Sequence, residues 1–340
     1  MTAAEGRGGL EELVQRADPQ ELLLEVDRLV AGRDWAGLVR LRDLCDAAVE
    51  LGKQLWSVAQ FAEYRLALEA PGPYAAAMCR SGAGRFALGP LTEVAASTHR
   101  WAELADHLTE PWIAATVAQE RVLRGEDLTG DVRAHTEELE LPPVLHPWEP
   151  DYPLPTYRPY ELIEGGPPPL ELAHRAVDAP PAPPLELPEL TRALTDAAAT
   201  WADGSNGGCH VATVRGDAAG AVAALVSGET ALAPVAPADV LARLAWTAAS
   251  GGAYGRRAGI AAGRSAAWWV ATVATGLPAA AAPDELGRAL QRLRWYVIGG
   301  GEGDLGWNLR VAIADPQGGW AVAVDAWDRL RDDDPRAATR

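Results

Sequence analysis

The sequence has 340 residues, of which 48% are hydrophobic and 23% charged, and its formal net charge is −17. This length and balance are typical of a globular protein with two domains, each able to bury a core. The negative charge argues against a protein that mainly holds a nucleic-acid backbone, because that affinity comes from Lys and Arg neutralising phosphates. It also repels anionic membranes.

The N-terminus and the cysteines favour a cytoplasmic protein. Residues 1–9 lack the basic start and apolar run of a signal peptide, and no apolar stretch reaches the roughly 18 residues that a membrane span needs. Cys45, Cys79 and Cys209 are odd in number and far apart. Neither a disulfide framework nor a zinc site is supported, and we expect no metal and no cofactor.

Helical patterns fill residues 1–140. The clearest helix start is Asp18, which can cap a helix that has Pro19 in its first turn, Glu21 in a capping-box position and Gly32 at its end. A second helix is predicted from Asp34. Its inward residues are Leu38, Leu41, Cys45 and Val49. Further helices are predicted near residues 55–68, 91–97, 101–108 and 112–123.

Two helix starts resemble each other. Trp35 and Trp101 each stand in the first turn of a predicted helix, 66 positions apart, which is twice the roughly 33 residues of common helix-pair repeats. We therefore expect stacked helix pairs in residues 1–140. The alternative is that both Trp side chains simply fill the core.

The composition changes at residue 141, because 15 of the 26 prolines lie between Pro142 and Pro188. Proline has no backbone N–H and biases the preceding residue towards extended geometry, so regular structure is interrupted there. We predict a linker over residues 141–187. Its aromatic first part, 141–161, is expected to be docked on one domain, and 165–187 is expected to be a looser spacer.

Residues 188–330 are predicted to form a smaller mixed α/β domain, followed by a charged tail at 331–340. The patterns indicate a helix near 187–201, a strand at 209–215, a second apolar stretch at 220–227, three helices, and two terminal strands. The last strands, 308–314 and 320–325, are joined by a good hairpin turn at 315–319. With four strands counted, the predicted fold class is α+β.

The segment 250–264, followed by Trp268 and Trp269, contains three arginines in an acidic protein. A glycine-rich turn that runs into a helix can offer backbone amides beside guanidinium groups, which suits phosphate or carboxylate. The candidate contacts with an anion or a partner are Tyr254, Arg256, Arg257, Arg264, Trp268 and Trp269. The alternative is packing: Gly255, Gly259 and Gly263 repeat every four residues and would let another element approach one helix face.

The remaining motifs give weaker indications of a functional site. Residues 301–306 match the letters GxGxxG, but a strand follows and two acidic residues lie in the loop, so an acidic hairpin loop is favoured over cofactor binding. The six histidines show no metal-ligand spacing, and no serine-hydrolase, P-loop or HExxH motif is present. Trp148, Trp268, Trp269 and Trp307 lie beside Gly, Pro or charge, where indoles often anchor interfaces.

The chain resembles uncharacterised proteins of GC-rich actinobacteria that belong to families of unknown function. The resemblance lies in residues 250–269, 293–296 and 306–307 and in the terminal hairpin, and the segment 86–95 and the Pro-Trp-Glu-Pro stretch at 147–150 look similar to the same group. The resemblance implies lineage and cytoplasmic residence, and it supplies no catalytic residues.

The leading hypothesis is a non-catalytic interaction or scaffold protein that docks a protein partner through the Arg and Trp cluster. The alternative is a cytoplasmic enzyme or sensor that binds a phosphorylated or carboxylate small molecule through residues 250–264. The overall charge disfavours nucleic acid as the ligand of that patch. An apolar helical face without a mate would suit a homodimer.

Overall fold

The computed structural model describes residues 5–330 except 168, 171, 172, 174, 227 and 300–305. Most of the GxGxxG-like loop and the charged tail therefore lie outside the described residues. The chain forms two compact units. Unit 1 comprises Met1–Val144 and Pro155–Ile163, and unit 2 comprises Leu145–Leu154 and Glu164–Arg340. The predicted α+β fold class is confirmed.

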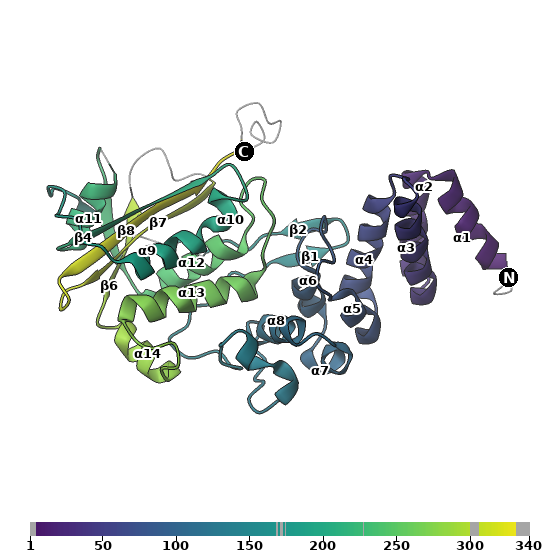
Figure 1. The fold of residues 1–340 in the computed structure, drawn as a ribbon, viewed down its shortest axis with the longest axis horizontal. Helices are drawn as coiled ribbons and strands as arrows, with labels where there is room; N and C mark the ends of the chain where they lie inside the picture. Colours follow the sequence, from purple (N-terminus) through teal and green to yellow (C-terminus); the bar gives the residue numbers. More distant parts are fainter. Residues whose placement is uncertain are drawn as a thin grey trace. The chain divides into compact units, whose positions relative to one another are not determined.

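Unit 1 is built from helices that pack in series. From α2 onwards each long helix contacts its neighbour in the chain or the next but one, as in the pairs α3 with α4, α4 with α6 and α6 with α8 (Figure 1). The elements are α1 (Glu5–Arg16), α2 (Pro19–Ala31), α3 (Trp35–Glu50), α4 (Trp56–Glu69), α5 (Gly72–Met78), α6 (Leu91–Thr98), α7 (Trp101–Leu104), α8 (Pro111–Val122) and the short 3-10 turns Ala105–His107, Val132–Ala134 and Thr136–Glu138.

The predicted helix caps are present at α2 and α3. Asp18 accepts a hydrogen bond from the Gln20 N–H at 2.9 Å, and Asp34 accepts one from the Gly37 N–H at 2.9 Å. Each cap satisfies an amide that the first turn leaves without a partner. Glu21, predicted to complete a capping box, instead pairs with Arg16 at 2.9 Å. The repeat of Trp35 and Trp101 stays a prediction.

A small hairpin completes unit 1. Strands β1 (Thr156–Arg158) and β2 (Glu161–Ile163) pair antiparallel. The Tyr157 hydroxyl donates to the buried Glu93 carboxylate of α6 at 2.6 Å, and the Tyr64 hydroxyl of α4 donates to the Arg158 carbonyl oxygen. The predicted linker is thus shared between the units: residues 145–154 belong to unit 2 and residues 155–163 to unit 1.

Unit 2 contains a six-stranded antiparallel sheet in the order β3-β5-β6-β7-β8-β4. The strands are β3 (Arg175–Ala176), β4 (Gly208–Arg215), β5 (Ala231–Val235), β6 (Arg294–Gly299), β7 (Trp307–Asp315) and β8 (Trp320–Asp328). The predicted strand at 209–215 and the terminal hairpin are confirmed. The helices are α9 (Pro188–Ala197), α10 (Ala199–Ala202), α11 (Ala218–Leu225), α12 (Pro237–Ala249), α13 (Ile260–Thr275) and α14 (Pro283–Leu290).

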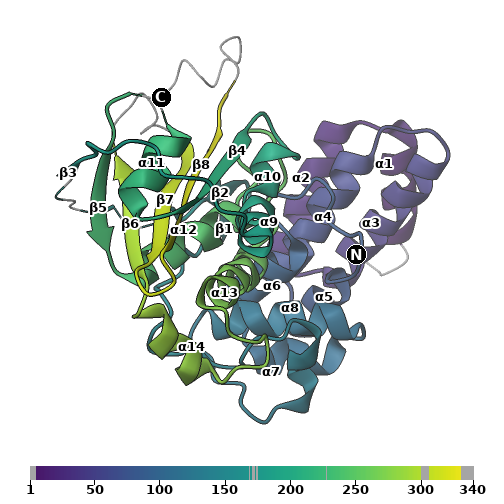
Figure 2. The ribbon, with the colours of Figure 1, turned by 60° about the vertical axis from the view of Figure 1, so that its left-hand side comes forward.

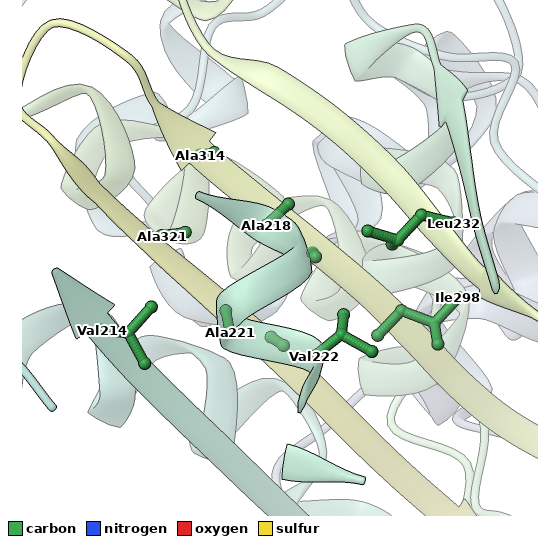
Figure 3. Packing of buried hydrophobic residues seen from close by; sticks show 10 residues of the cluster. Val214, Ala218, Ala221, Val222, Leu232, Ile298, Ala314 and Ala321 are labelled. Carbon is green, nitrogen blue, oxygen red and sulfur yellow. The ribbon is translucent and has the colours of Figure 1, made fainter. Parts of the chain in front are cut away.

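Helices cover both faces of this sheet (Figures 1 and 2). Helix α11 lies across β4, β7 and β8, and Ala218, Ala221 and Val222 pack on the strands (Figure 3). Alternate strand residues point to the other face, where α9 contacts β4, α10 contacts β8 and α12 contacts β6 and β7. The apolar stretch predicted as a strand at 220–227 is helical up to Leu225, where α11 ends, and the Asp217 side chain caps this helix through the Gly220 N–H.

The predicted loose spacer at 165–187 is held along the sheet in the part from 175 to 185. Strand β3 pairs with β5, and the Val177 N–H donates to the Thr230 carbonyl oxygen at 2.8 Å. At the opposite edge the Arg215 N–H donates to the Pro183 carbonyl oxygen at 2.8 Å, and the Leu185 N–H donates to the Thr213 carbonyl oxygen at 3.0 Å. Pro183 contributes only its carbonyl group and the non-proline residues Val177 and Leu185 supply the N–H donors, so proline-rich chain can line a sheet edge.

The close contact of α12 with α13 gives a test of helix packing. A Cβ atom added at Gly263 would lie 2.2 Å from the Ala245 carbonyl oxygen, so Gly263→Ala must push the two helices apart. We expect it to lower the free energy of unfolding by about 1–3 kcal/mol. In α1, Gly9→Ala meets nothing within 4 Å and should raise stability by up to about 1 kcal/mol. Urea unfolding measures both, and an unchanged midpoint for Gly263→Ala would contradict the packing argument.

Candidate binding site

Arg264 does not face a ligand. Its side chain is fully buried, and its Nε and Nη2 atoms donate to the two oxygens of Glu149 at 2.8 and 2.7 Å. The guanidinium lies 5.7 Å from the Trp268 ring centroid, and the Trp268 indole N–H donates to the same carboxylate at 2.8 Å. A bidentate pair of this kind is among the strongest polar contacts in proteins. The carboxylate predicted for this site is therefore supplied by the chain itself.

Glu149 is satisfied from several sides. Besides Arg264 and Trp268, the backbone N–H of His146 donates to the carboxylate at 3.0 Å, and the Tyr152 hydroxyl donates to it at 2.8 Å. Burial raises the pKa of Glu149, but the hydrogen bonds and charge of Arg264, with the other donors, outweigh it and hold the pKa below its ordinary value. Burial and the neighbouring carboxylate raise the pKa of Tyr152 well above its usual range. These contacts fasten residues 145–154 to α13.

The glycines before α13 serve a turn. Gly255 and Gly259 precede the helix, which begins at Ile260, so the predicted row of three glycines on one helix face is wrong. Gly252 has φ +66°, and a Cβ atom there would lie 2.0 Å from Oδ2 of the buried Asp328. Asp328 accepts from the Ala253 N–H, so a side chain at Gly252 would break this turn. Of the three glycines, Gly263 alone makes the predicted close approach between helices.

The remaining predicted contacts do not gather into one site. The Arg257 side chain is 4% exposed and lies 3.6 Å from the Glu164 carboxylate. Arg256 is exposed, as are Tyr254 and Trp269. The structure brings Arg264 and Trp268 together, and both donate to the Glu149 carboxylate instead of facing a ligand. In the described part of the chain, no group of three or more His, Cys, Asp or Glu side chains could hold a metal ion.

Unit 1 carries a concave surface of different chemistry, which we call the aromatic groove. Its volume is about 310 Å³, at the lower end of the range for ligand sites. The lining residues are Leu23, Trp56, Ser57, Gln60, Phe61, Tyr64, Phe86, Ala87, Leu88, Pro159 and Tyr160. They come from α2, from α4, from the loop before α6 and from the β1–β2 hairpin.

Two ring pairs form the walls of the groove. Trp56 and Phe86 have centroids 4.8 Å apart, and Phe61 and Tyr160 stack with centroids 5.2 Å apart. Trp56, Phe86 and Tyr160 are 43%, 61% and 66% exposed. Large aromatic side chains left this accessible in a concave surface are typical of a binding site.

Internal bonds hold these walls in place. The Phe86 N–H donates to Oε1 of Gln60 at 2.6 Å, which ties the loop to α4. The Tyr160 hydroxyl donates to Asp27 of α2, and Asp27 also pairs with Arg65 of α4. The Arg65 guanidinium lies 5.4 Å from the Phe61 ring and 5.7 Å from the Tyr160 ring. The hairpin is thereby attached to both helices.

The sequence alone does not predict this groove, because four separate segments build it. One signal was present: the chain has two phenylalanines against 13 tryptophans, and both phenylalanines line the groove. The spacing of Trp56, Gln60, Phe61 and Tyr64 also places them on one side of a helix. Neither signal identifies the loop or the hairpin that closes the site.

The Glu149 contacts predict a large and specific loss of stability. Glu149→Ala leaves the Arg264 cation buried without its partner and should cost about 3–5 kcal/mol in unfolding free energy. Glu189→Ala on the exposed face of α9 is the matched control and should stay within about 0.5 kcal/mol of the parent protein. Glu149→Leu combined with Arg264→Met should recover much of the loss. A loss below about 1 kcal/mol for Glu149→Ala would contradict a structural role.

The same pair predicts an acid dependence. Because the pKa of Glu149 is depressed in the folded protein, its contribution is present above the unfolded value of about 4.3 and is lost as the pH falls through the folded value. The stability difference between the parent protein and Glu149→Gln should therefore be constant near neutral pH and shrink below about pH 4.3. Urea unfolding at several pH values measures it, and a difference that grew on acidification would have the wrong sign.

None of the described helices is long and apolar enough to cross a membrane. No curated protein and no solved structure matches the chain. A protein-family model described as a family of unknown function, DUF6183, matches residues 20–324, which include most of both units and every residue of the aromatic groove. The chain therefore belongs to the DUF6183 family of unknown function.

Proposed function

We propose that this protein is a non-catalytic interaction module that binds a segment of a partner protein in the aromatic groove. The observation that carries the proposal is the set of three strongly exposed aromatic side chains, Trp56, Phe86 and Tyr160, gathered in one concave surface. Exposed aromatic rings held in place by the surrounding structure give a partner large contact area at little cost in conformational entropy.

The lining chemistry favours recognition over catalysis. No His, Cys, Asp, Glu, Lys or Arg is among the described residues that line the groove, so the Ser57 hydroxyl has no usual general base beside it in the lining. Both tyrosine hydroxyls in the lining already donate hydrogen bonds within unit 1. The groove thus offers mainly apolar and aromatic contact area.

The proposed docking surface is the aromatic groove and no longer residues 250–269. Arg264 and Trp268 are engaged by Glu149, and Arg257 lies against Glu164. We place the interaction in the cytoplasm, which is supported by three free thiols, of which Cys45 and Cys79 are buried. Burial raises the pKa of both to about 12, so neither is poised to react. The actinobacterial lineage stays a prediction.

A displayed library of random peptides, panned on the full chain, tests the proposal. We expect enriched peptides whose affinity falls at least about tenfold with Phe86→Ala or Trp56→Ala, since truncating a central aromatic contact commonly costs 2 kcal/mol or more. Both residues are exposed, so the variants should keep the melting temperature of the parent protein.

Trp112→Ala is the matched control, because Trp112 is also an exposed tryptophan of unit 1, at 53%, and does not line the groove. It should leave peptide affinity unchanged. Failure to enrich any peptide that depends on Trp56 or Phe86 would refute the proposed function.

A further inference from the structure

We infer that the segment bound by the aromatic groove is a proline-rich stretch of a partner protein with an acidic residue beside its prolines. This inference rests on the proposed function and names the chemistry of the partner. Three features of the groove support it: its unused hydrogen-bond groups, the arrangement of its rings, and the charge at its rim.

The unused side-chain groups of the groove are donors. In the part of the chain that the structure describes, no hydrogen bond engages the Trp56 indole N–H, the Ser57 hydroxyl or the Gln60 amide N–H₂. The Gln60 oxygen already accepts from Phe86, and the Tyr64 and Tyr160 hydroxyls already donate. Among the groups without a hydrogen bond, only the Ser57 hydroxyl could also accept, and the Tyr64 and Tyr160 hydroxyl oxygens keep acceptor positions of their own. The site therefore suits a ligand that brings acceptors.

Among the common modes of peptide recognition, this donor-rich surface fits polyproline best. A helical peptide uses its carbonyl groups internally, and an extended strand brings N–H groups in equal number with its carbonyl groups. Proline has no N–H, and a polyproline II segment leaves every carbonyl oxygen open to an outside donor. Ligands of this kind dock in grooves lined by aromatic rings.

The ring arrangement agrees with this geometry. The Trp56–Phe86 pair joins α4 to the loop before α6, and the Phe61–Tyr160 pair joins α4 to the hairpin. Trp56 and Phe61 are five residues apart on α4, so the two pairs follow each other along that helix. Flat proline rings pack on such aromatic faces, and the stiff backbone loses little entropy on binding.

The rim of the groove supplies the charge preference. Arg85 is exposed, and its guanidinium lies 5.6 Å from the Phe86 ring centroid. No ion pair engages Arg85 within the described residues, although the whole protein carries a net charge of −17. A cation left open beside the rings, in so acidic a protein, fits a carboxylate on the bound segment.

The protein's own proline-rich stretch is a poorer occupant. Its described residues from 175 to 185 lie along the sheet of unit 2, where the Pro183 and Leu185 carbonyl oxygens accept from Arg215 and Thr213. Two of the carbonyl groups that the groove would need are thus already used. A separate partner protein is the occupant to which we commit.

Calorimetric titration of the full chain with synthetic peptides tests the inference. The first probe is an acetylated polyproline peptide ending in aspartates, compared with the same peptide carrying alanines for prolines and with one carrying lysines for aspartates. We expect the first to bind, and both changes to weaken it at least about tenfold. Trp56→Ala and Phe86→Ala should abolish binding, and Trp112→Ala should not.

A charge exchange gives the sharpest control. Arg85→Glu should invert the preference, so that the lysine-ended peptide binds more tightly than the aspartate-ended one. An unchanged preference in this variant, or equal binding of the alanine peptide, would overturn the inference.

The random library separates this inference from the proposed function. Groove-dependent peptides without prolines would leave the proposed function standing and refute the polyproline ligand, whereas no groove-dependent peptide would refute both. Sedimentation velocity covers the remaining occupant: dimerisation that Trp56→Ala abolishes would assign the groove to a second copy of the chain and also overturn the inference.

Discussion

A buried ion pair between the Glu149 carboxylate and the Arg264 guanidinium holds residues 145–154 to α13, a helix that lies far along the sequence. Glu149 and Arg264 each have the other as compensation, and Trp268 and Tyr152 supply donors to the remaining acceptor positions of the carboxylate. Removing either partner leaves the other charge buried without compensation, so the loss of one side chain removes the stabilisation that both provide. Residues 145–154 are thereby committed to unit 2, and the chain that continues from them supplies Pro159 and Tyr160 to the groove of unit 1.

Hydrogen bonds from indole N–H groups give a physical reason for tryptophan in place of phenylalanine at several positions. The indole N–H of Trp101, Trp201 and Trp268 donates to Asp131, Ser250 and Glu149, at 2.9, 3.0 and 2.8 Å. Phenylalanine would leave these acceptors without a donor, so at these positions tryptophan joins apolar packing to polar satisfaction. The two phenylalanines stand where a ring face, rather than a donor, meets the exterior.

Local signals in the sequence predicted the elements that depend on neighbouring residues. The caps at Asp18 and Asp34 and the turn between β7 and β8 act within a few residues and were found. Strand β5 was missed because Pro234 argues against a strand, yet β3 pairs only with its first residues and no neighbour there needs a donor from Pro234. The role of Arg264 depends on a carboxylate 115 residues away, and the groove on four separate segments, and no local pattern carries such information.

The path of the chain between the units also bears on how the protein is made. Unit 1 needs residues 155–163 to close, whereas residues 145–154, made just before them, await α13. At ordinary rates of translation, of about 5–20 residues per second, Glu149 stays without Arg264 for on the order of ten seconds. During that interval every residue of unit 1 has been made, while residues 145–154 still lack the helix on which they pack in the finished protein.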